Sequence, residues 1–297
     1  MKYLYTDGRF LSIAKNNVST MVQAFNYGTA AFEGMKAFYS RERSKWFLFR
    51  PEEHYRRLKQ STSMLDIDFE MSLDEFVNII ATLIRKNNDR SDVYIRPIVF
   101  RSQKGVGLFK PSGYAVSIFT QPVPHSSANE YCCCFVSQRR PVDGTYSVKI
   151  TGNYVLSFFS QREATNKGYD VGILLSTNGY VSEASVMNLF FVEDGKLLTP
   201  SLACGPLGGI TRKSVMQLAN TELGIGVVEG KYRPARLLES DEVFFCGTGS
   251  GINYARQIEK RRFNLTNVNS IAKKISELLT AVTQGEVSRY SDWLRPL

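Results

Sequence analysis

The chain has 297 residues, of which 43% are hydrophobic, and a formal net charge of +9. This length and this apolar content predict a well-packed globular protein with one large or two moderate domains. No apolar run approaches the roughly 18 residues that a membrane span needs, and the N-terminus lacks the apolar core of a signal peptide, so we expect a cytoplasmic protein without membrane contact.

The excess of basic residues raises the question of nucleic-acid binding. Lysine and arginine number 37 against 28 acidic residues, and basic residues crowd the range 36–59. However, Glu42, Glu52 and Glu53 are interleaved with them. We interpret this stretch as a solvated face that also supplies one arginine for a phosphate, and we expect no nucleic-acid partner.

The five cysteines form neither a disulfide pattern nor a zinc pattern. Three of them are consecutive at residues 132–134, in a strand-like EYCCCFV segment where neighbouring side chains point to opposite faces. The chain has only two histidines, His54 and His125. We therefore expect packing cysteines and no metal site.

The first 121 residues read as strands alternating with helices. Asp7 and Gly8 form a two-residue turn, Pro51 opens a helix, and Ser72 with Glu75 forms a capping box. We expect a hairpin over 3–15, a glycine-broken aromatic segment over 22–38, a strand over 46–50, helices from 51 and over 72–86, and strands over 92–100 and 114–119. The segment 122–130 is rich in Pro, Ser and Asn and reads as an interdomain linker.

The remaining residues, 131–297, read as a second domain with turns at Asn178-Gly179 and Asp194-Gly195. We expect strands over 131–138, 171–176, 180–192 and 241–246, and helices over 155–168, 212–223 and 270–282. A glycine-rich turn at 205–211 precedes the helix expected over 212–223. A second one at 247–251 follows the strand expected over 241–246. Free N–H groups at the start of a helix favour a phosphate.

Lys149 is the candidate with the most chemistry. It lies between the apolar Val148 and Ile150 after a turn, so we expect it to point inward from a strand end. A buried lysine that loses its proton is the amine needed for an imine to a carbonyl cofactor. The alternative is an edge lysine whose ammonium extends to water.

Other charged residues stand at positions that suit ligand binding. Arg50 lies at a strand-to-helix junction, and Tyr94 and Arg96 share one strand face, where they can meet a carboxylate jointly. Glu183 lies within an apolar hairpin and needs a cationic or protonated partner. The alternative for Glu183 is an ordinary glutamate at a strand edge.

Ordered sequence blocks across about 240 residues resemble the fold type IV pyridoxal phosphate (PLP) enzymes, most closely the branched-chain amino acid aminotransferases. The blocks are YGTAAFEGMKAF, LFRPEEHYRRL, VYIRPIVF, SVKITGNYVLSFF, VSEASVMNLFF and GPLGGITRKSV. The resemblance implies an α+β (mixed α/β) fold with a small N-terminal domain (1–121) and a larger PLP-binding domain (131–297) containing a pseudo-barrel sheet. It also implies a homodimer that transfers an amino group between an amino acid and a 2-oxo acid, with 2-oxoglutarate as acceptor.

The resemblance assigns roles to matching residues. Lys149 would hold PLP and act as the catalytic acid and base. The residues implied in cofactor binding are Arg50, Lys149, Tyr154, Glu183, Ile210, Thr211 and Thr248. Those implied in substrate binding are Tyr27, Phe32, Tyr94, Arg96, Leu108 and Gly249, with Leu108 reaching the neighbouring subunit's site.

Two blocks depart from the branched-chain pattern, at SEASVMN (182–188) and GTGSGI (247–252). Both departures lie toward the substrate, so a D-amino-acid or amine aminotransferase, or an enzyme like aminodeoxychorismate lyase, is the alternative within this fold. A basic binding protein without catalysis is the alternative of another class, which the joint presence of Lys149, Glu183 and Arg50 disfavours. The sequence does not identify the preferred amino acid.

Overall fold

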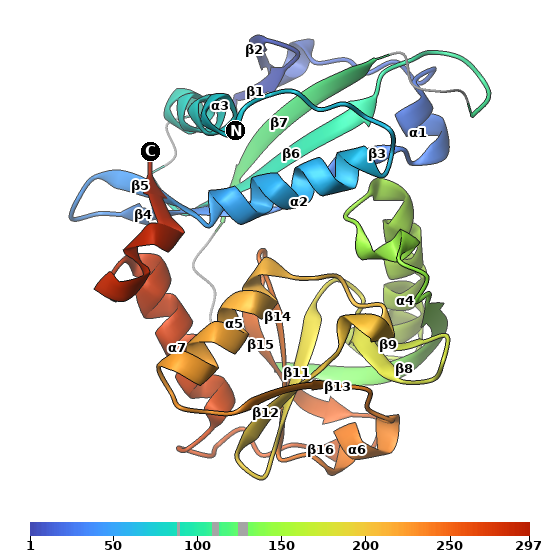
Figure 1. Ribbon diagram of the computed structural model, residues 1–297, viewed down its shortest axis with the longest axis vertical. Helices are drawn as coiled ribbons and strands as arrows, with labels where there is room; N and C mark the ends of the chain where they lie inside the picture. The colour runs from blue at the N-terminus through green and yellow to red at the C-terminus, as the bar shows by residue number, and fades with distance from the viewer. Residues whose placement is uncertain (88–89, 109–112, 124–129) are drawn as a thin grey trace. The chain divides into compact units, whose positions relative to one another are not determined.

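The structure is a computed structural model that describes residues 1–87, 90–108, 113–123 and 130–297 (Figure 1). The chain forms two compact units. The first comprises Met1–Ser126, Val148–Gly152 and Val282–Leu297, and the second comprises Ser127–Ser147 and Asn153–Ala281. The expected linker falls mostly on residues 124–129, which lie outside the described residues, as does His125. The segment Val148–Gly152, which carries Lys149, belongs to the first unit.

The first unit is built on an eight-stranded antiparallel sheet. Its strands are β1 (Tyr3–Thr6), β2 (Arg9–Ser12), β3 (Ala30–Phe32), β4 (Met35–Ser40), β5 (Lys45–Phe49), β6 (Val93–Arg101), β7 (Tyr114–Pro122) and β17 (Leu294–Pro296). The order is β17-β5-β4-β6-β7-β1-β2, with β3 also paired to β6. In Figure 1 the C-terminal strand β17 lies beside β5, which it joins antiparallel.

The helices that start at Pro51 and Leu73 cover this sheet, and both start where the sequence indicated. The helices of the unit are α1 (Gln23–Tyr27), α2 (Pro51–Ser63) and α3 (Leu73–Asn87). The Ser72 hydroxyl accepts the Glu75 N–H at 3.1 Å, which confirms the predicted cap. The apolar stripe of α3, including Phe76 and Ile80, packs into the core against strand residues such as Ile95.

The second unit is built on a nine-stranded mixed sheet. Its strands are β8 (Glu130–Arg140), β9 (Val171–Ser176), β10 (Val181–Ala184), β11 (Asn188–Glu193), β12 (Lys196–Pro200), β13 (Val227–Gly230), β14 (Glu242–Gly247), β15 (Gly251–Ile258) and β16 (Arg261–Arg262). The order is β10-β9-β8-β15-β14-β11-β12-β13, with β16 on β15. Strand β8 runs parallel to both of its neighbours.

Four helices accompany this sheet: α4 (Tyr154–Asn166), α5 (Ile210–Thr221), α6 (Pro234–Glu239) and α7 (Ile271–Gln284). Helix α7 starts in the second unit and ends in the first. Phe191, Phe245 and Ile173 lie in the larger core cluster, while Val136, Ala164 and Leu174 form a smaller one under α4. Short 3-10 turns complete the described chain, at Ile13–Lys15, Thr145–Ser147, Thr151–Asn153, Leu202–Cys204 and Ser288–Trp293.

The predicted strand over 180–192 was wrong as one continuous element. The chain forms β10, turns over residues 185–187 and starts again as β11. The two pieces pair with different neighbours, because β10 joins β9 whereas β11 joins β14 and β12. Helix α5 likewise starts two residues before its predicted start at Arg212.

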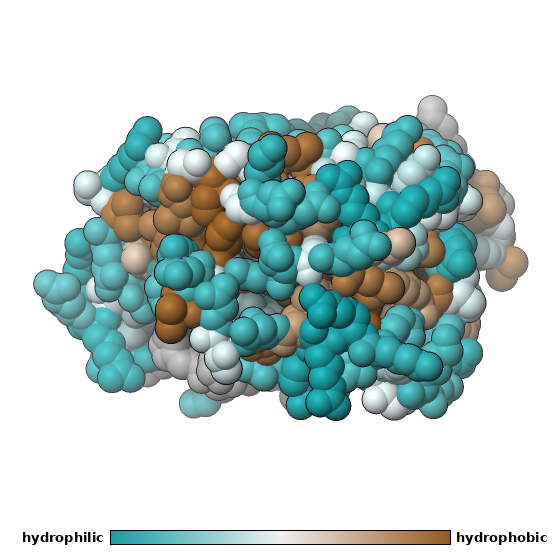
Figure 2. Space-filling model, turned by 90° about the horizontal axis from the view of Figure 1, so that it is seen from below, coloured by the Kyte–Doolittle hydropathy of each residue, from teal (hydrophilic) through white to brown (hydrophobic). Residues whose placement is uncertain are grey.

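One face of the molecule carries apolar side chains in separate patches (Figure 2). In this view, brown apolar groups are surrounded by hydrophilic ones. Among the residues that the structure describes, every helix is too short or too polar to cross a membrane.

Candidate active site

Hydrogen bonds on both sides of its peptide hold the Lys149 backbone in place. Its N–H donates to the Ser61 hydroxyl at 3.1 Å, and its carbonyl accepts the Phe32 N–H at 3.0 Å. Downstream, the Thr151 hydroxyl donates to the Gly28 carbonyl at 2.7 Å. Lys149 is thus fixed between helix α2 and the segment that carries strand β3.

Gly28 must be a glycine for this arrangement. Its φ is +66°, and a Cβ there would lie 2.9 Å from the Gly152 Cα. The Gly152 N–H also donates to the Gly28 carbonyl at 3.0 Å. The Gly-punctuated sequence therefore brings the two backbones into direct contact, and the Lys149 segment docks on it.

The Lys149 ammonium lies over the Phe32 ring, 4.5 Å from its centroid. The Arg96 guanidinium lies 4.6 Å from the same ring centroid and donates to the Tyr94 hydroxyl at 2.6 Å. A Cβ on Gly34 would come within 2.2 Å of that hydroxyl, so Gly34 makes room for the pair. Two of the residues predicted for the site, Lys149 and Arg96, thus share the Phe32 ring, and Tyr94 joins them through Arg96.

A buried ion-pair network is centred on the residue after Phe32, and the sequence reasoning missed it. Glu33 is fully buried and accepts from Arg57 Nε at 2.6 Å and from His54 Nδ1 at 2.8 Å. Burial alone would raise the pKa of Glu33, but the Arg57 guanidinium and the His54 ring outweigh it and hold this pKa well below the usual range. Burial lowers the pKa of His54, and the bond to Glu33 offsets only part of that effect.

Arg50 is buried at the N-cap of α2 in the left-handed conformation, with φ +48°. Its Nε donates to Glu53 Oε1 at 2.9 Å, and its guanidinium stacks 4.1 Å from the Trp293 ring centroid. The Arg50 N–H also donates to the Trp293 carbonyl at 2.7 Å. The C-terminal segment that carries Trp293 therefore orients this arginine.

Tyr27 at the end of α1 binds the loop that carries Leu108, and both side chains are exposed. The Tyr27 hydroxyl accepts the Gly107 N–H at 2.8 Å, and Gln23 Nε2 donates to the Gly107 carbonyl at 3.2 Å. Leu108 itself is 76% exposed. Helix α1 thus holds the loop that presents Leu108.

In the second unit, Glu183 is a buried carboxylate surrounded by donors. Its Oε1 lies 3.0 Å from Arg140 Nε, and its Oε2 accepts the Leu207 N–H at 3.0 Å and Asn188 Nδ2 at 3.4 Å. The predicted need for a cationic partner is met by Arg140, which the sequence reasoning did not identify.

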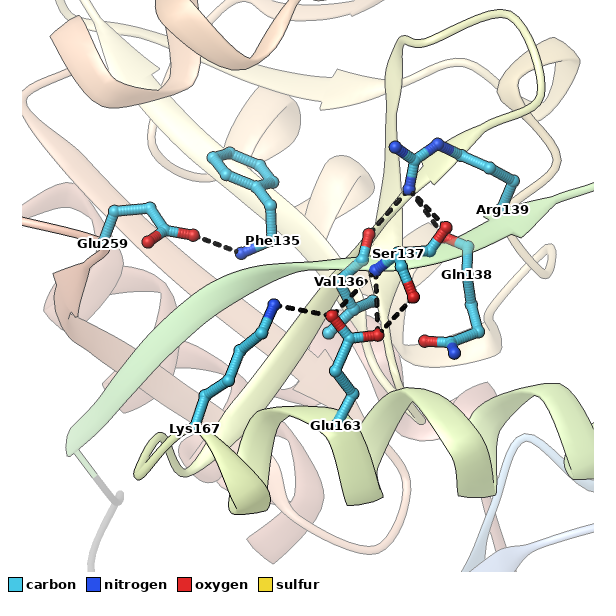
Figure 3. Close-up of polar contacts among 8 residues, drawn as sticks. All are labelled: Phe135, Val136, Ser137, Gln138, Arg139, Glu163, Lys167 and Glu259. Atoms are coloured by element: carbon cyan, nitrogen blue, oxygen red, sulfur yellow. Dashed lines mark hydrogen bonds and ion pairs between the residues drawn. The ribbon is translucent and has the colours of Figure 1, made fainter.

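Strand β8 is irregular just before Arg140, the partner of Glu183. The pairing of β8 with β9 shifts register between Phe135 and Arg139. Figure 3 shows the Arg139 guanidinium folded back on its own strand, donating to the carbonyls of Val136, Ser137 and Gln138. Arg140, the next residue, is buried and also donates to the Gly205 carbonyl at 3.0 Å.

Helix α4 braces the same bulge from outside. Glu163 accepts a hydrogen bond from the Ser137 N–H at 3.0 Å and forms an ion pair with Lys167 at 2.6 Å (Figure 3). Burial tends to raise the pKa of the Glu163 carboxyl, but the bonds from Lys167 and Ser137 lower it to about 2. The first residue of this helix, Tyr154, is half-buried.

The glycine-rich turn before α5 approaches Asn188 closely. A Cβ on Gly209, the N-cap of α5, would lie 2.0 Å from Asn188 Oδ1. Ile210 and Thr211 are the first two helical residues and are buried. Their N–H groups lie at the positive end of the helix, which suits a phosphate.

The second glycine-rich turn joins β14 to β15. Thr248 is half-buried and Gly249 is exposed in this turn. Asn253 Nδ2 fixes the turn by donating to the Ser250 carbonyl at 3.0 Å.

Comparisons with known proteins agree on one family. A family model described as amino-transferase class IV matches residues 30–258. A probable branched-chain-amino-acid aminotransferase of Aquifex aeolicus is 32% identical over 302 residues, which cover 100% of this chain and 97% of that protein.

Solved structures give the same result. The branched-chain aminotransferase of Thermoproteus uzoniensis with norvaline superposes with a TM-score of 0.93 at 31% identity, covering 99% of this chain and 98% of that one. The branched-chain amino acid aminotransferase of Thermobaculum terrenum in its PLP-form (holo-form) also gives 0.93, at 29% identity, with 99% and 98% covered.

Proposed function

The chain belongs to the class IV aminotransferases, and we propose that it exchanges the amino group of a branched-chain amino acid with the oxo group of 2-oxoglutarate. The predicted family, the fold type IV architecture and the PLP cofactor are confirmed. The protein is therefore a PLP-dependent aminotransferase that catalyses transamination. The branched-chain donor and the 2-oxoglutarate acceptor are the proposal.

The arrangement around Phe32 carries the proposal. An apolar ring, the Lys149 ammonium and the Tyr94–Arg96 pair lie within one cluster. The ring supplies an apolar wall for a branched side chain, while Arg96 and Tyr94 supply donors for a carboxylate. The relatives reported above are all named branched-chain aminotransferases, which supports the same substrate class.

The donor groups of the chain fit PLP. A buried carboxylate held by Arg140 suits a protonated ring nitrogen, and an arginine together with a helix N-terminus suits a phosphate. When bound, PLP supplies a carbonyl carbon for the amino group and an aromatic ring that withdraws electrons. We propose Glu183 for the ring nitrogen, and Arg50, Ile210, Thr211 and Thr248 for the phosphate, with Tyr154 contributing to cofactor binding.

We propose that Lys149 Nζ holds the cofactor covalently and moves the proton during the reaction. The Lys149 ammonium and the Arg96 guanidinium share the Phe32 ring, so the amine lies next to the groups proposed for the substrate carboxylate. Arg96, Tyr94 and Gly249 would bind the substrate carboxylate, and Tyr27 would line the substrate side.

We also propose that the protein is a homodimer in the cytoplasm. Met21, Phe25 and Leu108 expose large apolar side chains on segments joined by the bridge between Val22 and Lys104. A second subunit would cover them, with Leu108 contributing to its site. The five cysteines are free thiols, which suits a reducing compartment.

A donor panel tests the proposed substrates. Purified protein loaded with PLP is mixed with 2-oxoglutarate and L-leucine, L-isoleucine, L-valine, D-alanine or a primary amine, and formation of glutamate is measured. We expect rapid conversion of the three branched-chain donors. Faster conversion of D-alanine or of the amine would overturn the branched-chain assignment and favour the alternative enzymes of this fold.

A further inference from the structure

One face of helix α2 carries a row of buried polar side chains. Arg50 at its N-cap, then His54, Arg57 and Ser61 follow at the spacing of successive helical turns. His54 and Ser61 are 1% and 0% exposed, and the side chain of Arg57 is 13% exposed. Buried polar groups are costly without partners, so a row of four indicates a defined set of contacts.

The contacts of three members of this row, Ser61, His54 and Arg57, lead to the Lys149 cluster. Ser61 binds the Lys149 backbone N–H. His54 and Arg57 both bind Glu33, whose neighbour Phe32 binds the Lys149 carbonyl through its N–H. Helix α2 therefore holds the lysine directly and also holds the segment that carries the ring under its ammonium.

Glu33 is the centre of this arrangement. It receives two bonds from Arg57, at 2.6 and 2.8 Å, and one from His54 at 2.8 Å. Its two neighbours in sequence touch the site, because Phe32 underlies Lys149 and Arg96, and Gly34 makes room for Tyr94. A shift of Glu33 would displace both walls of the cluster.

We propose that Glu33 is a positioning residue for the reaction at Lys149, acting through Arg57 and His54 to lock the segment 32–34 on helix α2. The inference rests on the proposed role of Lys149. This role requires no contact between Glu33 and the reacting atoms. It fixes the position of the ring beneath the Lys149 ammonium and balances the charge of Arg57.

Glu33→Gln tests this role because it keeps the volume of the side chain and removes its charge. The Arg57 cation then loses its counter-charge, which disfavours a protonated group at Lys149. In the PLP-loaded protein we expect the visible absorption band to titrate about half a pH unit or more lower than in the wild type. We expect kcat to fall about tenfold or more, with a smaller change in KM.

Asp66→Asn is the matched control. Asp66 pairs with the buried Arg101 of the same unit at 3.4 Å, and its φ of +51° is one that asparagine tolerates. This variant also deprives an arginine of its carboxylate partner, but here the carboxylate is not the neighbour of Phe32. We expect it to leave the band titration and kcat unchanged.

A measurement on the protein without cofactor separates positioning from charge. Hydrogen exchange of the Phe32 and Lys149 amides should be faster in Glu33→Gln than in the wild type and unchanged in Asp66→Asn. Wild-type exchange, band titration and kcat in a folded Glu33→Gln would show that Glu33 is only a packing residue. Because the wild type keeps its turnover in that case, the proposed function would stand.

Arg57→Lys keeps the test decisive if Glu33→Gln does not fold. It retains the cation but loses the paired guanidinium bonds to Glu33. We expect faster exchange of the Phe32 amide and a several-fold lower kcat. Wild-type values of both in this variant would overturn the proposal.

Discussion

Arg140 and Glu183 form an ion pair at 3.0 Å in which both side chains are largely buried. Arg140 also donates to the carbonyls of Gly205 and Tyr146, so its orientation is fixed by three groups. Such a pair needs good geometry on both sides, because the two charges have left water. In the proposed site, Arg140 therefore determines where the Glu183 carboxylate lies.

Arg140→Met should destabilise the protein strongly. Removing one partner of a buried pair leaves an uncompensated charge, which costs about 3 to 5 kcal/mol in free energy of unfolding. Denaturant unfolding measures the loss. The double variant Arg140→Met with Glu183→Gln should recover part of it, and a double variant as unstable as the sum of the two single changes would show that the residues do not act as a pair.

Lys149→Ala should retain the fold and lose the visible absorption band of the PLP-loaded protein, together with turnover. The reason is that no amine would remain at this position to hold the cofactor. Spectroscopy on the purified variant measures the band.

Lys36→Ala is the matched control, since Lys36 is also half-buried and lies over an aromatic ring, that of Phe38. Burial lowers the pKa of Lys36, which makes it the rival amine of the first unit. Loss of the band in Lys36→Ala with its retention in Lys149→Ala would move the anchor to Lys36.

Arg50→Ala should weaken PLP binding more than it changes the choice of amino donor. A charge-assisted contact to a phosphate contributes roughly 1.5 to 3 kcal/mol, equivalent to about tenfold to 150-fold in Kd. Titration of the cofactor-free variant with PLP measures Kd. An unchanged Kd would return Arg50 to a structural role as the partner of Glu53 and Trp293.

The sequence predicted the site where neighbouring residues share an element. Tyr94 and Arg96 alternate on one strand, and the structure joins them by a hydrogen bond at 2.6 Å. The Ser72 cap and the Asp7-Gly8 turn are likewise decided by local chemistry. These features depend on only a few consecutive residues, so they can be read without knowing the fold.

The residues that the sequence did not reveal are partners across the fold. Arg140 pairs with Glu183 across a long stretch of sequence, after a register shift in β8 that no local pattern indicates. Glu33 and His54 meet because α2 lies against β3, and nothing in the spacing of the two residues indicates it. A glutamate between Phe32 and Gly34 in an apolar segment was the available signal, because a buried carboxylate there requires a cation.

The stability of the protein should fall on acidification, first through His54. Burial lowers the pKa of His54 in the folded chain from its ordinary 6.5, so folded His54 stays neutral where unfolded His54 is protonated. Unfolding then takes up a proton, and the stability present above pH 6.5 is lost as the pH falls toward the folded pKa. Glu33 adds a second loss below its ordinary pKa of 4.5.

His54→Asn tests this pH dependence. Asparagine keeps a donor for Glu33 but does not titrate. The unfolding temperature of the variant should therefore fall less than that of the wild type between pH 7.5 and 5.5. If unfolding takes up one proton, the free energy of unfolding changes by at most about 1.4 kcal/mol per pH unit. An equal slope in both proteins would assign the effect to other groups.

Glu183→Gln should bind PLP and lose most of its transamination rate. A neutral amide cannot keep the pyridine nitrogen protonated, so the bound cofactor withdraws electrons less effectively. The phosphate contacts proposed for Arg50, Ile210, Thr211 and Thr248 are unchanged, so Kd for PLP should stay close to the wild-type value. The loss should appear in the chemical step, because the interaction strengthens only as negative charge develops in the ring.

Single-turnover kinetics with L-leucine separate this step from binding. Glu259→Gln is the control, since Glu259 is a half-buried carboxylate of the same unit that accepts the Phe135 N–H at 2.8 Å (Figure 3). It should keep the wild-type rate. If Glu183→Gln converts L-leucine at nearly the wild-type rate, Glu183 serves only to hold Arg140 and the Leu207 N–H in the fold, and the ring nitrogen requires another partner.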